Sequence, residues 1–99
     1  MRIIAVSTLR DFWHLPGRGD SEQALRAWVH IVKAADWSNP ADVKCMFRSA
    51  DILPNDRLVF DIRGNKYRLI AAVYYRGKRV FIRFIGTHAE YDRIDATTI

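Results

Sequence analysis

The stretch NKYRLIAAVYYRGKRVFIRFIGTHAEYD, residues 65–92, decides the fold. It contains two runs of β-branched and aromatic residues, which the dipeptide RG at 76–77 separates. A third run of this kind, RLVFDI at 57–62, comes before it and ends at a second RG pair, 63–64. Short turns between such runs favour β-hairpins. The pattern therefore predicts a three-stranded antiparallel meander, followed by a short helix from about Thr87.

The first half of the chain predicts a short strand and then helices. Apolar residues at 3–6 indicate the strand, and Ser7 or Thr8 can cap the helix that follows. The clearest helical period is a set of apolar residues spaced i, i+3, i+4 and i+7: Leu25, Trp28, Val29 and Val32. A third helix begins with Asn39 as its cap and Pro40 in its first position. The order of elements predicts an α+β fold, with the N-terminal helices on one face of an antiparallel sheet and a short C-terminal helix.

The composition supports one folded domain over residues 1–99. Hydrophobic residues make up 49% of the chain, enough for a real core. The single cysteine, Cys45, excludes an internal disulfide and a multi-cysteine zinc site, and its apolar neighbours predict that it is buried. No histidines, cysteines or carboxylates have metal-ligand spacing, so we expect neither a metal nor another cofactor. The longest apolar run, Leu69–Tyr75, is too short to span a bilayer, and the start lacks the features of a secretory signal. We therefore expect a cytoplasmic protein.

Charge is distributed unevenly along the chain. The net charge is +5, from 16 basic and 11 acidic side chains. Residues 1–56 contain seven of each and are neutral, whereas residues 57–99 contain nine basic and four acidic groups and carry the whole excess. A positive field confined to one half of a chain favours a polyanion partner, most commonly nucleic acid. The alternative is a solvated basic surface that maintains solubility.

Alternation along the predicted strands separates an apolar face from a basic one. If the turns contain two residues, Val73 lies opposite Val80 and Leu69 lies opposite Phe84. The face that these four residues share is otherwise apolar apart from Lys78 at the turn, and should face the helices: Tyr67, Ala71, Tyr75 and Ile82. The opposite face carries four cations with aromatic residues between them: Lys66, Arg68, Arg79 and Arg83. This face is expected to bind nucleic acid, or to be the ordinary solvent face of a half-buried sheet.

The same register places charged residues beside one another. Arg68 and Arg83 become diagonal neighbours, about 7–8 Å apart at the backbone. In the first hairpin, Val59 lies beside Arg68, and Asp61 lies beside Lys66 as a cross-strand ion pair. A one-residue bulge in a strand would change these assignments, because it moves the following side chains to the other face.

Polar residues follow the last predicted strand, in the segment GTHAEYD. Thr87 and Glu90 fit a capping box, which gives them a structural role. His88 and Tyr91 are three residues apart and share one face of the helix. The helix dipole disfavours a cation in the first turn, which favours a neutral imidazole able to accept a proton. The amides of this turn are also a suitable place for a phosphate.

Four side chains can converge at this end of the sheet: Arg68, Arg83, His88 and Tyr91. Together they suit the cleavage of RNA without a metal, which needs a base for the 2′-hydroxyl, an acid for the leaving 5′-oxygen and cations for the phosphorane. The alternative is that His88 is a solvated or hydrogen-bonded residue with no part in chemistry.

The segment Val59–Asp95 resembles the HigB-type toxins of bacterial type II toxin–antitoxin systems, which are relatives of the RelE and ParE toxins. The resemblance rests mainly on the blocks GNKYRL and GTHAEYD, and continues more weakly upstream. It implies a compact RelE-like, microbial RNase-like fold and an endoribonuclease, an mRNA interferase that cuts transcripts, often on the translating ribosome. It also implies a HigA-like helix-turn-helix antitoxin as partner. Only the antitoxin would bind operator DNA directly, and the toxin would be associated with the DNA through it.

The resemblance assigns roles to particular residues. The matching positions in the two blocks are Asn65, Lys66, Arg68, His88, Tyr91 and, less closely, Asp92. Catalysis is expected from Arg68, His88 and Tyr91, and RNA binding from Lys66, Arg79 and Arg83. The base and the acid stay open among His88, Tyr91 and Lys66. Two other functions stay open as well: a non-catalytic nucleic-acid-binding module, and a ParE-like toxin directed at DNA gyrase.

Overall fold

A computed structural model describes all of residues 1–99 as a five-stranded sheet with helices on both sides. The strands are β1 (Arg2–Ile4), β2 (Asp51–Leu53), β3 (Arg57–Ile62), β4 (Tyr67–Tyr74) and β5 (Arg79–Thr87). The helices are α1 (Val6–Trp13), the 3₁₀ turn η1 (Gly19–Ser21), α2 (Glu22–Ala34), α3 (Pro40–Met46) and α4 (His88–Tyr91). The strand order is β1-β5-β4-β3-β2, in which only the β1–β5 pair is parallel. The predicted α+β class and the β3–β5 meander are confirmed; β2 is too short for sequence periodicity to reveal it.

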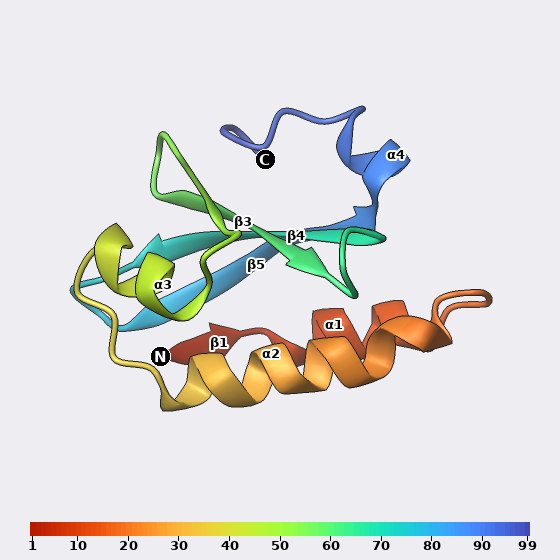
Figure 1. Cartoon of the computed structure of the whole chain (residues 1–99), viewed down its shortest axis with the longest axis horizontal. Coiled ribbons are helices and arrows are strands. Elements are labelled where there is room, and N and C mark those ends of the chain that lie inside the picture. The colour runs from red at the N-terminus through yellow and green to blue at the C-terminus, as the bar shows by residue number, and fades with distance from the viewer.

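The helices divide between the two faces of the sheet. Figure 1 shows α1 and α2 side by side below the sheet, and α4 with the C-terminus above it. The main core lies between these two helices and the sheet. Leu25, Trp28 and Val32 of α2 are buried in it as predicted, and Val29 is partly buried. None of the helices combines the length and the apolar character needed to cross a bilayer.

Trp28→Ala should destabilise the domain by about 3–5 kcal/mol, the usual cost of emptying a large aromatic site. Trp28 is 3% exposed and packs edge-on against Phe60, with ring centroids 5.3 Å apart. The measurement is urea denaturation followed by circular dichroism. Ile31→Ala is the matched control on the same helix: its side chain is 38% exposed and its loss should cost about 1 kcal/mol or less. Equal losses for the two variants would contradict the packing of α2 described here.

Two local predictions in the helices are wrong and one is confirmed. Helix α1 begins at Val6 without a side-chain cap, so Ser7 and Thr8 lie inside its first turn instead of capping it. Cys45 is exposed, because the buried residue of α3 is Val43, and residues two apart on a helix face different sides. The predicted cap of α3 is present: Asn39 accepts a hydrogen bond from the backbone of residue 42.

The first hairpin differs in register from the prediction. Its loop contains four residues, 63–66, and Asp61 lies opposite Arg68 instead of Lys66. Val59 correspondingly lies opposite Ile70. The shift is two residues, so every side chain keeps its predicted face. It changes only which charged residues meet, and the expected Asp61–Lys66 ion pair is therefore wrong.

The second hairpin follows the predicted register only as far as a bulge. Val73 lies opposite Val80 as predicted, but Leu69 lies opposite Ile85 and not opposite Phe84. The extra residue is Arg83, which has no partner on β4. A bulge moves the side chains that follow it to the other face. Phe84 therefore leaves the apolar face, and Ile85 packs against the main core in its place.

The face expected to be open and cationic is covered along much of its length. Val59, Ile70 and Ala96 form a second, smaller core there, and Phe84 and Tyr91 pack against it. The C-terminal segment lies over this face because further hydrogen bonds tie it to the sheet: Asn55 and Arg57 donate to the backbone of Thr97 and Ile99. The cations of this face are therefore separated: Arg68 lies beside α4, whereas Arg79 and Arg83 are exposed farther along β5.

Candidate active site

The junction between β5 and α4 is a well-formed helix start. Thr87 Oγ1 accepts a hydrogen bond from the Glu90 backbone at 3.2 Å, and Glu90 Oε1 accepts one from the Thr87 backbone at 2.8 Å. The predicted capping box is present. The backbone hydrogen bond from Thr87 lowers the pKa of Glu90 below its ordinary value. Arg18, 3.7 Å from Glu90, adds an ion pair that joins α4 to the loop after α1.

Gly86 allows this junction to pack closely. It lies opposite Arg68 in the sheet and is buried. A Cβ atom at this position would come within 2.6 Å of the Phe84 ring and 3.1 Å of Glu90 Oε1. A side chain here would therefore displace the ring that supports the second core or the carboxylate of the capping box.

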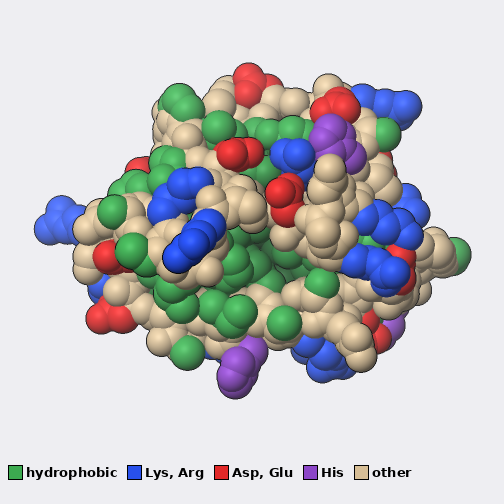
Figure 2. Space-filling model, viewed as in Figure 1, with side chains coloured by type: hydrophobic (Ala, Val, Ile, Leu, Met, Phe, Trp, Pro, Cys, Tyr) green, Lys and Arg blue, Asp and Glu red, His purple; other side chains and the backbone are tan.

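The structure brings Arg68, His88 and Tyr91 into contact. Arg68 Nη2 lies 3.1 Å from His88 Nε2, and the guanidinium lies over the Tyr91 ring, 5.1 Å from its centroid. The His88 and Tyr91 rings are 6.2 Å apart and steeply inclined. Arg68 is only 17% exposed, whereas His88 is 47% exposed. In Figure 2 a histidine lies among basic and acidic side chains in the region of α4.

The two neighbours of His88 suit one tautomer of its ring. Arginine nitrogens only donate, so His88 Nε2 must accept from Arg68 with a lone pair. The ring proton is then on Nδ1, which faces Asp92 Oδ2 at 3.3 Å. In the tautomer with the proton on Nδ1, Asp92 orients the ring through Nδ1–H and the lone pair of Nε2 is directed at the guanidinium.

Asp61 is part of the cluster, although the predicted register placed it beside Lys66. Its Oδ1 lies 3.0 Å from Arg68 Nε, an ion pair that lacks the alignment of a hydrogen bond. The pair is mostly shielded from water, since the two side chains are 17% and 28% exposed. Asp61 therefore holds the guanidinium at Nε, while His88 contacts Nη2. The signal in the sequence was the lone acid in RLVFDI on the same face as Arg68.

Lys66 belongs to a different group of charges. It forms an ion pair with Asp20, which also accepts a hydrogen bond from the Tyr67 hydroxyl and lies 3.6 Å from Arg63. The hydrogen bond to Asp20 raises the pKa of Lys66 and, with that from Tyr67, lowers the pKa of Asp20. The Lys66 ammonium is therefore held by Asp20 at the loop between β3 and β4 and does not join the cluster around Arg68.

The two other expected RNA-binding residues do not join the cluster. Arg79 and Arg83 are exposed and make no ion pair. Arg79 begins β5 and His88 follows its last residue, so the two lie about 30 Å apart along the strand. Arg83 is at the bulge, between these positions. No group of three or more histidines, cysteines and carboxylates lies close enough to hold a metal ion.

Comparison with known proteins identifies the family. The model of the HigB toxin family, described as the RelE-like toxic component of a toxin–antitoxin system, matches residues 21–94. The chain belongs to this family. It is 34% identical over 73 residues to the mRNA interferase HigB of Escherichia coli O6:H1 (strain CFT073), covering 72% of this chain and 71% of that one. It is 33% identical over 70 residues to the mRNA interferase toxin HigB of Escherichia coli K12, covering 69% and 67%.

The HigB match spans the cluster but not the whole fold. Residues 21–94 include Asp61, Arg68, His88, Tyr91 and Asp92. Strand β1 and helix α1 lie outside the matched residues. The resemblance to HigB-type toxins inferred from the sequence blocks is confirmed.

Proposed function

We propose that this HigB-family chain is an endoribonuclease toxin that cuts mRNA on translating ribosomes and is neutralised by a cognate helix-turn-helix antitoxin. The contact of Arg68 with His88 Nε2, beside the Tyr91 ring, is the observation that carries the proposal. Family membership and the names of the relatives support it.

The cluster contains the groups that RNA cleavage by internal transfer requires. A base removes the proton of the ribose 2′-hydroxyl, the oxygen attacks phosphorus, and the bond to the 5′-oxygen breaks as that oxygen receives a proton. The products are a 2′,3′-cyclic phosphate and a 5′-hydroxyl. His88 Nε2 is the base in this scheme, and it becomes free when Arg68 turns from the imidazole to the phosphate.

Tyr91 and Arg68 supply the remaining roles. Tyr91 is held by the second core, and its hydroxyl makes no hydrogen bond within the chain, so it is available as the acid. Arg68 stabilises the charge that develops on the phosphorane. Lys66 suits the role of base less well, because its raised pKa keeps it protonated. We assign Lys66 and Arg83 to binding of the RNA backbone. Arg79 would contact the RNA farther from the site of cleavage.

Expression of the chain without an antitoxin should arrest bacterial growth, because uncontrolled mRNA cleavage stops translation. The readouts are colony formation and mapping of new 5′-hydroxyl ends on cellular mRNA. The doubly substituted chain, His88→Gln with Arg68→Ala, is the control and should permit growth at equal expression. Co-expression of a helix-turn-helix protein encoded beside the gene should restore growth.

The same experiment separates the alternatives. A non-catalytic binding module would leave mRNA ends unchanged, and a gyrase-directed toxin would arrest growth with altered DNA supercoiling and intact mRNA. Normal growth at high levels of soluble wild-type chain would contradict the toxin proposal. Comparing ribosome-bound mRNA with naked mRNA in vitro tests the requirement for translation.

A further inference from the structure

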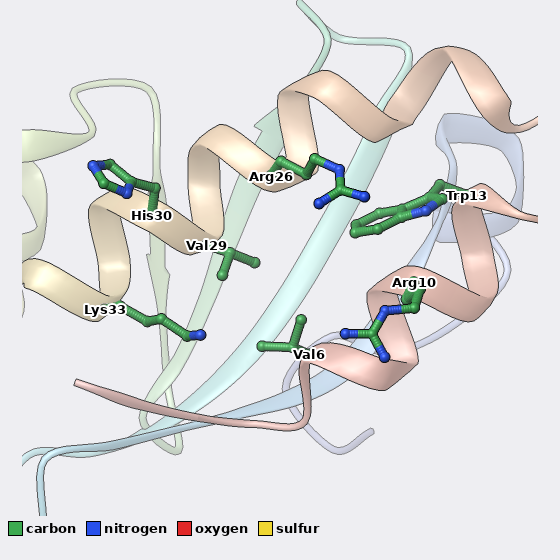
Figure 3. Close-up of a pocket in the computed structure, with 7 residues that line it drawn as sticks. All are labelled: Val6, Arg10, Trp13, Arg26, Val29, His30 and Lys33. Atoms are coloured by element: carbon green, nitrogen blue, oxygen red, sulfur yellow. The ribbon is translucent and has the colours of Figure 1, made fainter.

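A basic groove lies between α1 and α2, apart from the cluster around Arg68. Its volume is about 290 Å³, and its lining residues come from both helices: Val6, Arg10, Trp13, Arg26, Val29, His30 and Lys33. Figure 3 shows Arg10, Arg26 and Lys33 directed into the space between the helices, with Val6 and Val29 between them. The groove therefore combines basic walls with an apolar floor.

The groove carries a positive charge that the sequence does not indicate. Residues 1–56 are neutral in sum, yet no aspartate or glutamate lines the groove. Arg26 is neutralised by Glu22, whose Oε2 lies 2.8 Å from the guanidinium Nε. Arg10 and Lys33 have no carboxylate partner and are exposed. Folding thus gathers basic side chains on one surface and leaves two of them unpaired.

The lining favours an acidic peptide over single-stranded RNA. Proteins that hold single strands use exposed aromatic rings on which bases stack. Two rings line the groove: the Trp13 indole is 4% exposed and lies beneath the Arg26 guanidinium, 4.8 Å from the ring, and only the smaller imidazole of His30 is exposed. An apolar floor between cations instead suits a segment that alternates apolar and acidic side chains, such as one face of an amphipathic helix.

The groove and the candidate active site lie on opposite sides of the sheet. Helices α1 and α2 cover one face, and α4 lies on the other. A partner in the groove would leave Arg68 and His88 uncovered. It would also contact residues of α1, which lies outside the part of the chain matched by the family.

We propose that the groove between α1 and α2 docks an acidic, amphipathic segment of the cognate antitoxin. This inference rests on the proposed function, since it supposes a neutralising protein partner. Arg10 and Lys33 pair with carboxylates of that segment, and its apolar side chains lie on Val6 and Val29. Charged contacts of this kind raise the association rate and make binding sensitive to salt.

The test is titration of the purified antitoxin into the chain carrying His88→Gln, which allows the toxin to be prepared. Adding Arg10→Glu and Lys33→Glu should weaken binding by roughly 10- to 100-fold, and raising the salt concentration should reduce the difference. The neutral pair Arg10→Gln and Lys33→Gln should weaken binding less and guards against misfolding, which circular dichroism monitors. The matched control is Arg48→Glu with Arg76→Glu, two exposed arginines outside the groove.

The outcomes distinguish the groove from the proposed function. If the chain with an intact groove binds antitoxin and both groove variants bind with the same Kd, the groove is not the docking site and the toxin proposal stands. If the groove variants keep antitoxin binding but lose ribosome binding, the groove holds RNA and the inference is overturned. If the chain with an intact groove binds no antitoxin, the proposed neutralisation by an antitoxin is contradicted, and the groove inference is contradicted with it. In cells, a chain that carries Arg10→Glu and Lys33→Glu but keeps His88 should still arrest growth when the antitoxin is co-expressed.

Discussion

His88→Gln should slow mRNA cleavage by roughly 10²–10⁴-fold, because it removes the group that we propose transfers the proton. The fold should be kept, since the capping box uses Thr87 and Glu90 and not the imidazole. Glutamine preserves much of the size and polarity of histidine but is not a base. The measurement is single-turnover cleavage of a reporter mRNA on translating ribosomes, with circular dichroism as the folding control.

Two neighbouring substitutions make this prediction sharper. Tyr91→Phe keeps the ring beneath the Arg68 guanidinium and tests the hydroxyl alone. Asp92→Asn keeps the position of the side chain but removes the charge that orients His88 Nδ1–H, so it should reduce the rate by less than His88→Gln does. It should also change the pH dependence of the rate, which a purely structural residue would not. If His88→Gln and Tyr91→Phe both cleave at the wild-type rate, α4 contributes no catalytic group and its capping box has a structural role only.

Arg68→Ala should lower the cleavage rate by about 10²–10³-fold, the usual effect of removing one preorganised group that stabilises transition-state charge. Arg68 is suited to this role because its side chain is only 17% exposed and Asp61 and the Tyr91 ring hold its guanidinium, so that only the contact with His88 is exchanged for the phosphate. Arg68→Lys is the matched variant: it keeps the charge but cannot reach His88 and Asp61 together. It should recover only part of the rate.

Added guanidinium ion provides the decisive control for Arg68. It should partly restore cleavage by Arg68→Ala and should not affect His88→Gln, because only the first variant leaves a space of the right shape and charge. Unfolding measurements are needed alongside, since the substitution also leaves Asp61 without its ion pair. A folded Arg68→Ala variant that cleaves at the wild-type rate would transfer the role of the cation to Lys66 or Arg83.

Features that depend on a few consecutive residues could be predicted from the sequence. The strand runs, the helical period of α2 and the capping box at Thr87 and Glu90 are examples. Each is stabilised by hydrogen bonds or packing between residues within four positions of one another or within one strand run. The proximity of His88 to Tyr91 follows from the same local geometry. The family resemblance could be recognised for a related reason, since its two blocks are short and contiguous.

The partners of the charged residues were decided by tertiary structure. A four-residue loop placed Asp61 beside Arg68, and a bulge at Arg83 moved Phe84 to the second core. The predicted and the observed registers of the first hairpin place every side chain on the same face of the sheet. The hydrophobic pattern therefore could not distinguish between them. Lys66 pairs with Asp20, 46 residues away in the sequence, because α1 and η1 fold back over the end of the sheet. Sequence alone thus determined the elements and the chemistry available at their ends, while long-range packing determined which of those groups meet.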